Sequence, residues 1–219
     1  MFRLDKHMQL TEDPKFYEPR DCFLAPIPDI FAAANLLSRA ADAILEKNLT
    51  LAEDLIMQAD MSALEAHNGK IATYRSREIH RVRLVPGAPP TMKDRTQRMP
   101  SYKVELSIYE RDGWHCRFCQ SPITSKEARK KMHLLFPMAA RWGKANSEKH
   151  RGLSILESTL DHLLPHSRGG DNSLENLVAA CGPCQFGRGN FTLEEVGLNN
   201  PFSRPPINDN WDGLRRLVK

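Results

Sequence analysis

The spacing of apolar residues predicts a pair of amphipathic helices in the first third of the chain. Apolar residues recur every three or four positions from Asp29 to Lys47, and the same spacing returns from about Thr50 to Ala66. Asn48 lies between the two stretches and suits the N-cap of the second helix. The pattern therefore predicts a helical hairpin, which we interpret as a module for docking to a partner protein or for positioning a substrate.

Proline-rich segments interrupt the apolar pattern on both sides of this hairpin. Four prolines before residue 29 block a long helix there, and residues 84–100 contain four prolines, one glycine and several charges without an apolar period. We therefore predict a mainly helical N-terminal module at 1–83 and a linker at 84–100. A second domain follows at 101–198, and a C-terminal tail at 199–219.

The second domain mixes helical and strand patterns. Residues 103–111 suit a short helix or a strand, and residues 125–146 predict a helix that Pro137 interrupts, within an insertion at 125–151. Residues 156–165 predict a strand that enters a turn, and residues 173–188 contain a further helix. The fold class that follows is α+β.

The charge of the chain is only mildly basic. Lys and Arg number 31 against 27 Asp and Glu, and the isoelectric point is near 8.8. The basic residues gather in three runs, namely Arg75, Arg77, Arg81 and Arg83; Lys126, Arg129, Lys130 and Lys131; and Arg141, Lys144, Lys149 and Arg151. Such runs are most often solvated faces, although phosphate contact is the alternative.

The chain offers no membrane segment. Its first residues lack the apolar region of a signal peptide, and no stretch approaches the run of about 18 apolar residues that a membrane helix needs. We therefore expect a cytoplasmic protein. In a reducing compartment, the five cysteines are interpreted first as candidates for metal binding.

Four of the cysteines form two C-x-x-C pairs. Cys116 and Cys119 make the first pair, and Cys181 and Cys184 the second, a pattern typical of a tetrahedral zinc site. Four thiolates would leave no open coordination position, so the predicted zinc is structural. Disulfides, or two unrelated buried pairs, are the alternatives.

Three segments around these cysteines resemble the HNH endonuclease family, in the branch that carries two C-x-x-C pairs. They are RDGWHCRFC at 111–119, LDHLLPHSRGGDNSLENLVAACGPC at 160–184, and the QFGRGN that follows. The resemblance implies a ββα-metal nuclease, in which a β-hairpin and a helix hold one divalent ion, Mg²⁺ or Mn²⁺. The scissile phosphate would lie between that ion and a histidine.

The resemblance also implies roles for individual residues. Asp161 would be a metal ligand, His162 the general base, and Asn176 the residue that hydrogen-bonds across the loop to orient the histidine. Where the family has a His or Asn metal ligand, this chain has Gln185, whose amide oxygen is one methylene further out and either binds the ion or is replaced by water. Adjacent strand residues face opposite sides, so Asp161 and His162 can serve one site only where the backbone bends.

Three further residues are candidates for contact with nucleic acid. Arg168 and Arg188 flank the predicted site and suit bidentate phosphate contact, although each is a surface arginine by default. His166 either contacts phosphate or assists the metal, with an exposed loop histidine as the alternative.

The predicted function is hydrolysis of phosphodiester bonds in DNA by nicking or cutting, with RNA not excluded. Family members act in restriction and phage defence, so the resemblance implies such a role, with partner proteins docked on the N-terminal helices. The alternative is a zinc-stapled DNA-binding module whose catalysis is weakened, which the glutamine at position 185 keeps open.

Overall fold

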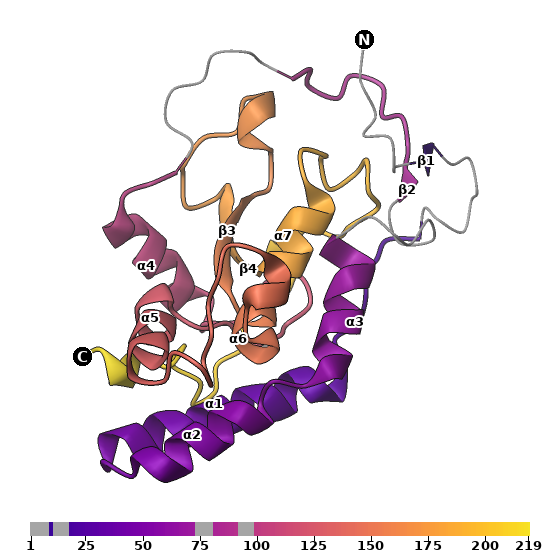
Figure 1. The fold of residues 1–219 in the computed structure, drawn as a ribbon. Coiled ribbons are helices and arrows are strands. Elements are labelled where there is room, and N and C mark those ends of the chain that lie inside the picture. Colours follow the sequence, from indigo (N-terminus) through magenta and orange to yellow (C-terminus); the bar gives the residue numbers. More distant parts are fainter. Residues whose placement is uncertain (1–8, 11–17, 73–80, 92–98) are drawn as a thin grey trace.

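The computed structural model describes residues 9–10, 18–72, 81–91 and 99–219, and Figure 1 shows their arrangement. The helices are α1 Pro28–Leu45, α2 Leu49–Gln58, α3 Ser62–Ala72, α4 Tyr102–Arg111, α5 Lys126–Leu135, α6 Arg151–Ile155 and α7 Gly182–Arg188. The strands are β1 Gln9–Leu10, β2 Arg81–Val82, β3 Ser158–His162 and β4 Leu177–Cys181. Short 3₁₀ helices are η2 Asn146–Glu148, η3 His166–Arg168, η4 Pro201–Ser203 and η5 Arg215–Leu217.

Two small sheets accompany the helices. Strand β1 pairs with β2 in parallel, and β3 pairs with β4 antiparallel. Helices at the N-terminal end and a two-stranded hairpin later in the chain confirm the predicted α+β class. Part of the predicted linker, residues 92–98, lies outside the described residues.

The predicted helical hairpin is present as α1 and α2, which lie side by side (Figure 1). Asn48 is the N-cap of α2, as predicted, because its side-chain oxygen accepts a hydrogen bond from the backbone N–H of Leu51 at 3.2 Å. Leu37 and Ile56 are fully buried, so the apolar faces of the two helices meet inside the protein.

The prediction of one helix from 50 to 66 is wrong, because the chain turns at Asp60, between α2 and α3. The carboxylate of Asp60 accepts hydrogen bonds from the backbone N–H of Arg151, at 2.7 Å, and from the side chain of Arg141. These partners are at least 81 residues away along the chain. The apolar spacing therefore contains no sign of the break, which a tertiary contact stabilises.

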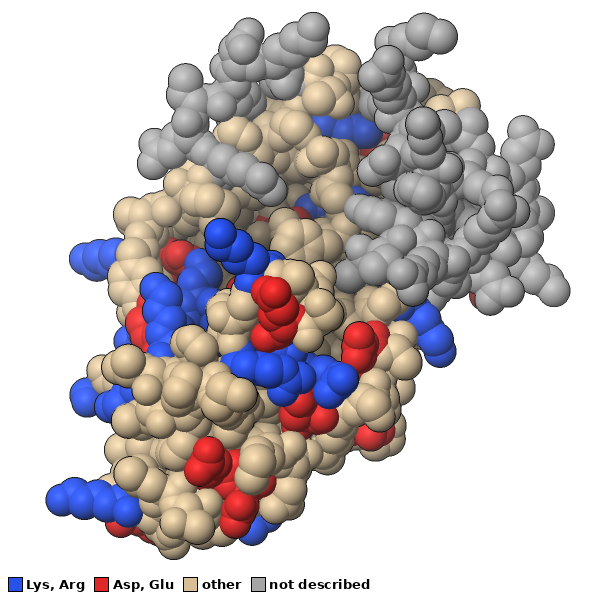
Figure 2. All heavy atoms as spheres, viewed as in Figure 1, with Lys and Arg blue, Asp and Glu red and all other residues tan. Residues whose placement is uncertain are grey.

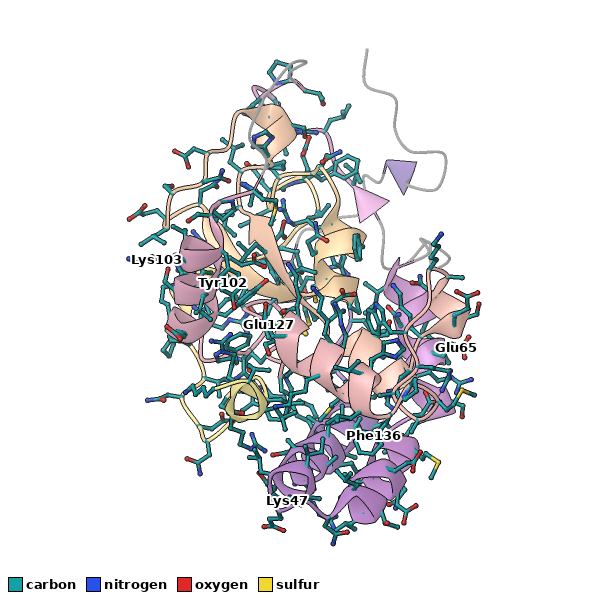
Figure 3. All side chains as sticks on the ribbon, turned by 60° about the vertical axis from the view of Figure 1, so that its left-hand side comes forward. Lys47, Glu65, Tyr102, Lys103, Glu127 and Phe136 are labelled. Carbon is teal, nitrogen blue, oxygen red and sulfur yellow. The ribbon has the colours of Figure 1, made fainter. Side chains whose placement is uncertain are left out.

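One hydrophobic core joins the N-terminal helices to distant parts of the chain. It contains buried side chains from α1, α2 and α3, from α5 and α6, and from the C-terminal segment. Phe136 lies in this core, where the end of α5 meets the α1–α2 pair (Figure 3). Leu214 and Leu217 are buried there too, so the predicted tail at 199–219 packs against the rest of the protein. The domain boundaries stay a prediction, and this core spans the predicted linker.

A second core surrounds the β3–β4 hairpin. It contains buried residues of α4, both strands and the four paired cysteines, and Trp211 packs against both cores. Residues 102–111 form a helix, so of the two structures that the sequence allowed for 103–111 the helix is observed. Helix α5 ends at Leu135, two residues before the proline that was predicted to interrupt it, and the predicted helix does not resume, because residues 136–145 are turn and irregular structure.

Several side chains of the basic runs pair with acids of the same chain. Arg129 binds Glu157 at 2.6 Å, and Lys126 binds Glu105 at 2.8 Å. Figure 2 shows the result, with Lys and Arg side chains lying beside Asp and Glu on this face. Residues 73–80, which include two arginines of the first run, lie outside the described residues.

His150 connects α6 to α2. Its Nε2 lies 2.7 Å from the carbonyl oxygen of Ile56, and its Nδ1 accepts a hydrogen bond from the backbone N–H of Leu153 at 3.0 Å. A neutral imidazole satisfies both bonds, with the proton on Nε2. Burial of the ring lowers the pKa of His150 below its ordinary value.

Replacing His150 with asparagine should lower the free energy of unfolding near neutral pH by about 1–3 kcal/mol, because the shorter side chain leaves the Ile56 carbonyl without its buried donor. The unfolded chain titrates His150 near pH 6.5, about the ordinary value, while the folded pKa is lower. The unfolded state therefore binds more protons as the pH falls below that value, and the stabilisation by His150 is lost. In urea unfolding, the difference in the free energy of unfolding between the unaltered protein and the asparagine variant should become smaller from about pH 7 to about pH 5. A constant difference would contradict this assignment.

Candidate active site and zinc centre

The four paired cysteines meet at one point beneath the hairpin. Their sulfur atoms all lie within 4.8 Å of one another, and the sulfurs of Cys119 and Cys181 are 3.7 Å apart. A tetrahedral zinc with Zn–S bonds of about 2.3 Å holds its sulfurs about 3.8 Å apart, so the donor set fits zinc. All four thiols are free of disulfides. The arrangement favours the predicted zinc site over either alternative.

Hydrogen bonding within the cluster favours the thiolate form of Cys119, while it raises the pKa of Cys181 and Cys184. Hydrogen bonds from Cys116, Cys181 and Cys184 hold the pKa of the Cys119 thiol well below its usual range. A thiolate is the form that binds zinc. With no open position left by four cysteines, zinc here would connect the 116–119 turn to β4 and α7 and would take no part in catalysis.

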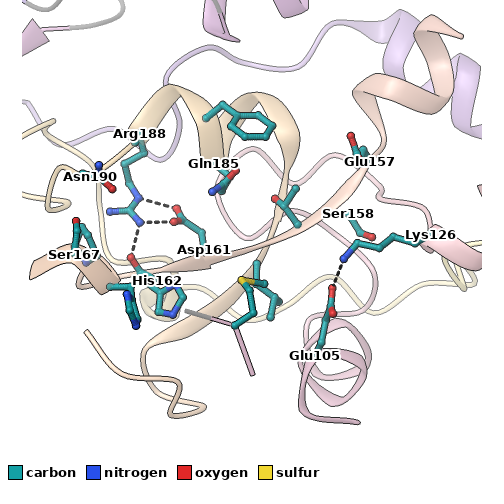
Figure 4. Close-up of a pocket in the computed structure, with 17 residues that line it drawn as sticks. Glu105, Lys126, Glu157, Ser158, Asp161, His162, Ser167, Gln185, Arg188 and Asn190 are labelled. Carbon is teal, nitrogen blue, oxygen red and sulfur yellow. Dashed lines mark hydrogen bonds and ion pairs between the residues drawn. The ribbon is translucent and has the colours of Figure 1, made fainter. Parts of the chain in front are cut away.

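The candidate site is built on β3, β4 and α7. In the hairpin, Asp161 lies opposite Val178 and His162 opposite Leu177, and α7 begins directly after β4. A cavity of about 420 Å³ lies beside β3 and α7, and Figure 4 shows its lining. We call it the site pocket; its lining includes Glu157, Asp161, His162, His166, Gln185, Phe186 and Arg188. Five of the predicted catalytic and nucleic-acid-binding residues therefore line one cavity, namely Asp161, His162, His166, Gln185 and Arg188.

His162 is held in place by a residue that the sequence analysis missed. Its Nε2 lies 2.8 Å from the side-chain oxygen of Asn172. With that oxygen as acceptor, Nε2 carries the proton and Nδ1 keeps its lone pair. Burial lowers the pKa of His162 below its ordinary value, against the opposing effects of the Asn172 bond and the Asp161 charge. The ring of His166 is 5.6 Å away and meets that of His162 edge-on.

Asn176 hydrogen-bonds across the loop, as the resemblance implies, but to backbone groups. Its oxygen accepts from the N–H of Leu164 at 2.8 Å, and its amide nitrogen donates to the carbonyls of Leu164 and Asp171. Gly170 closes the same loop, because a Cβ there would lie 1.7 Å from the Leu164 carbonyl oxygen. Asn176 therefore shapes the loop that carries Asn172, while Asn172 contacts the histidine.

If the chain has the nuclease activity that the resemblance implies, replacing Asn172 with alanine should lower the cleavage rate by about 10- to 100-fold, since outer residues that fix the tautomer and orientation of a catalytic histidine have effects of this size. The exposed Asn35 on α1 offers a matched control, and its replacement by alanine should leave the rate unchanged. Single-turnover rates on a nicked-plasmid assay measure both. Equal rates for the two variants would show that Asn172 does not position His162.

Asp161 is buried and paired with Arg188. The Nε of Arg188 donates to one carboxylate oxygen at 2.6 Å, and an Nη of the same guanidinium donates to the other oxygen (Figure 4). Asp161 and Gln185 offer hard oxygen donors on one pocket, which is the donor type that Mg²⁺ and Mn²⁺ prefer. The donor set therefore suits such an ion chemically, although the carboxylate is also the partner of Arg188.

Arg168 lies apart from the pocket lining. Its guanidinium binds Glu195 at 2.9 Å, and its side chain is 2% exposed. A buried pair of this kind usually stabilises the fold around it, because separating it leaves a buried charge. The predicted phosphate contact of Arg168 would require this pair to open, and it stays a prediction, as does that of Arg188.

Residues 147–189 match the family model of the HNH endonucleases. The matched span includes β3, β4, α7 and the second cysteine pair, so the chain contains an HNH endonuclease domain with a cysteine cluster compatible with zinc. Such a domain indicates nuclease activity in general and interaction with nucleic acid. No curated protein and no solved structure matched the chain. None of the helices in the described residues is long and apolar enough to cross a membrane.

Proposed function

We propose that the protein is a metal-dependent endonuclease that hydrolyses phosphodiester bonds in DNA. The observation that carries the proposal is the arrangement of His162, which lies in the site pocket beside Asp161 with its Nε2 bound to Asn172. A histidine with one nitrogen fixed and the other carrying a lone pair is suited to take a proton from water.

In this mechanism His162 is the general base. Its Nδ1 removes a proton from the attacking water, and Asn172 holds the ring while the imidazolium forms. The lowered pKa of His162 keeps the imidazole neutral, and so able to accept that proton, near neutral pH. A divalent ion, Mg²⁺ or Mn²⁺, held by Asp161 and Gln185, would supply charge stabilisation to the phosphate and its leaving oxygen.

Cleavage of supercoiled plasmid tests this function. With Mg²⁺ or Mn²⁺ the protein should nick or linearise the plasmid, and EDTA should stop the reaction. A matched RNA substrate belongs in the same experiment, since cleavage of RNA alone would overturn the DNA assignment. Failure to cleave either nucleic acid with both ions would overturn the proposed enzyme.

A second candidate is a zinc-stapled DNA-binding module with weakened catalysis. Two observations favour it, namely glutamine at position 185 and the bond of Arg188 to both oxygens of Asp161. This module would bind DNA with steep salt dependence and leave it intact in every metal. The plasmid experiment, run beside a binding titration at several salt concentrations, separates the two functions.

The cellular role that we propose is restriction or phage defence, on the strength of the family resemblance. The plating efficiency of phage on bacteria that express the protein tests it. Protection that disappears in a variant without His162 would support a defence role by cleavage. Equal plating with and without the protein would oppose it.

A further inference from the structure

Arg188 makes an unusually complete set of bonds around Asp161. Nε and Nη2 donate to the two carboxylate oxygens, Nη2 also donates to the carbonyl oxygen of His162, and Nη1 donates to that of Phe191. The arginine side chain is 1% exposed and that of Asp161 is 5% exposed. The guanidinium is therefore a fixed part of the pocket wall, and it joins the end of α7 to the end of β3 (Figure 4).

The guanidinium of Arg188 and the ion that the proposed function requires would use the same carboxylate. A side-on pair uses both carboxylate oxygens and neutralises the charge of Asp161. A divalent ion bound to the same carboxylate would sit beside the guanidinium, in a buried place where water screens like charges weakly. An ion at Asp161 is therefore disfavoured while the guanidinium holds both carboxylate oxygens.

We propose that Arg188 gates the divalent-ion site by competing with the ion for Asp161. In the free protein the guanidinium holds the carboxylate, and an ion binds Asp161 only as Arg188 withdraws from it. Binding of the ion to the free protein is consequently weak. This inference rests on the proposed function, in which Asp161 holds the ion, and it assigns Arg188 the further role of setting how tightly that ion binds.

Mn²⁺ binding measured by electron paramagnetic resonance tests the gate without any cleavage. Arg188→Met keeps most of the length of the side chain and removes its charge, so it should bind Mn²⁺ at least ten-fold more tightly than the unaltered protein. Arg188→Met combined with Asp161→Asn should lose that gain. The matched control is Arg216→Met, which removes another paired arginine outside the pocket lining and leaves the bonds of Arg188 in place; its Mn²⁺ affinity should equal that of the unaltered protein. An Arg188→Met protein that is folded and binds Mn²⁺ no more tightly than the unaltered protein would overturn the gate.

A second measurement avoids the risk that a buried arginine cannot be replaced. In the unaltered protein, the nuclear magnetic resonance signal of the Arg188 Nε–H should shift or exchange faster as Mg²⁺ is added, because the Asp161 bond opens. Mg²⁺ that shifts the backbone signals of Asp161 and Gln185 while the Arg188 signal stays constant would overturn competition. Both measurements report ion binding, so their outcome does not depend on whether the protein cleaves DNA.

Discussion

Replacing His162 with alanine should lower the rate of phosphodiester cleavage by about 100- to 10,000-fold, the usual contribution of a positioned general base. The alanine has no group to take the proton of the attacking water, and it removes the ring to which Asn172 is bonded. The fold should persist, because His162 is at the end of β3 and its backbone pairing with Leu177 does not depend on the ring. Single-turnover cleavage of plasmid with saturating Mg²⁺ measures the effect.

His133 provides the matched control for this variant. It lies on α5, away from the site pocket, and its ring bonds to the carbonyl of Ala140. His133→Ala should cleave at the unaltered rate. Circular dichroism and zinc content should be the same in both variants. If His162→Ala cleaved as fast as the unaltered protein, the general base would have to be another group.

Replacing Cys181 with serine should release zinc and unfold the region around the hairpin. Structural zinc in small modules contributes about 10–16 kcal/mol of apparent binding free energy, comparable to the whole stability of a domain at about 5–15 kcal/mol. Cys181 ends β4 and lies in the second core with the other three ligands, so its loss affects both strands and α7. Zinc content by mass spectrometry and the thermal unfolding midpoint measure the result.

Cys22 supplies a control of the same chemistry. It is outside the four-cysteine cluster, and its thiol donates a weak bond to the carbonyl of Leu24, which a serine hydroxyl can also make. Cys22→Ser should keep one zinc per chain and unfold near the unaltered midpoint. A Cys181→Ser protein that remained folded without zinc would disprove the structural role of the metal.

The elements with a clear local signal were predicted well. The helix over 29–47 appears as α1, the N-cap at Asn48 is formed, and α5 stops short of Pro137. Each of these depends on residues within a few positions of one another, namely apolar spacing, a capping side chain or a proline. The exception is the break at Asp60, which depends on arginines from the insertion.

In the candidate site, too, the residues of the motif were predicted and a partner brought in by the folded loop was not. The motif placed Asp161, His162 and Gln185 together, and all three line the site pocket. Adjacent strand residues were expected to need a bend to serve one site, and both Asp161 and His162 reach the pocket where β3 ends. The motif did not reveal Asn172 as the partner of the histidine, because the loop must close before that amide reaches the ring.

The sequence by itself determined the two cysteine pairs, the amphipathic helices and the order of the nuclease motif, because each depends on the spacing of residues that are close together along the chain. Only the tertiary structure decided which groups those residues bind. Arg188 reaches Asp161 across 27 positions and Arg168 reaches Glu195 across the same number, so two arginines that were predicted to contact phosphate lie in buried ion pairs. The sequence shows which side chains are charged, but packing determines their partners, because an unpaired buried charge strongly destabilises the fold.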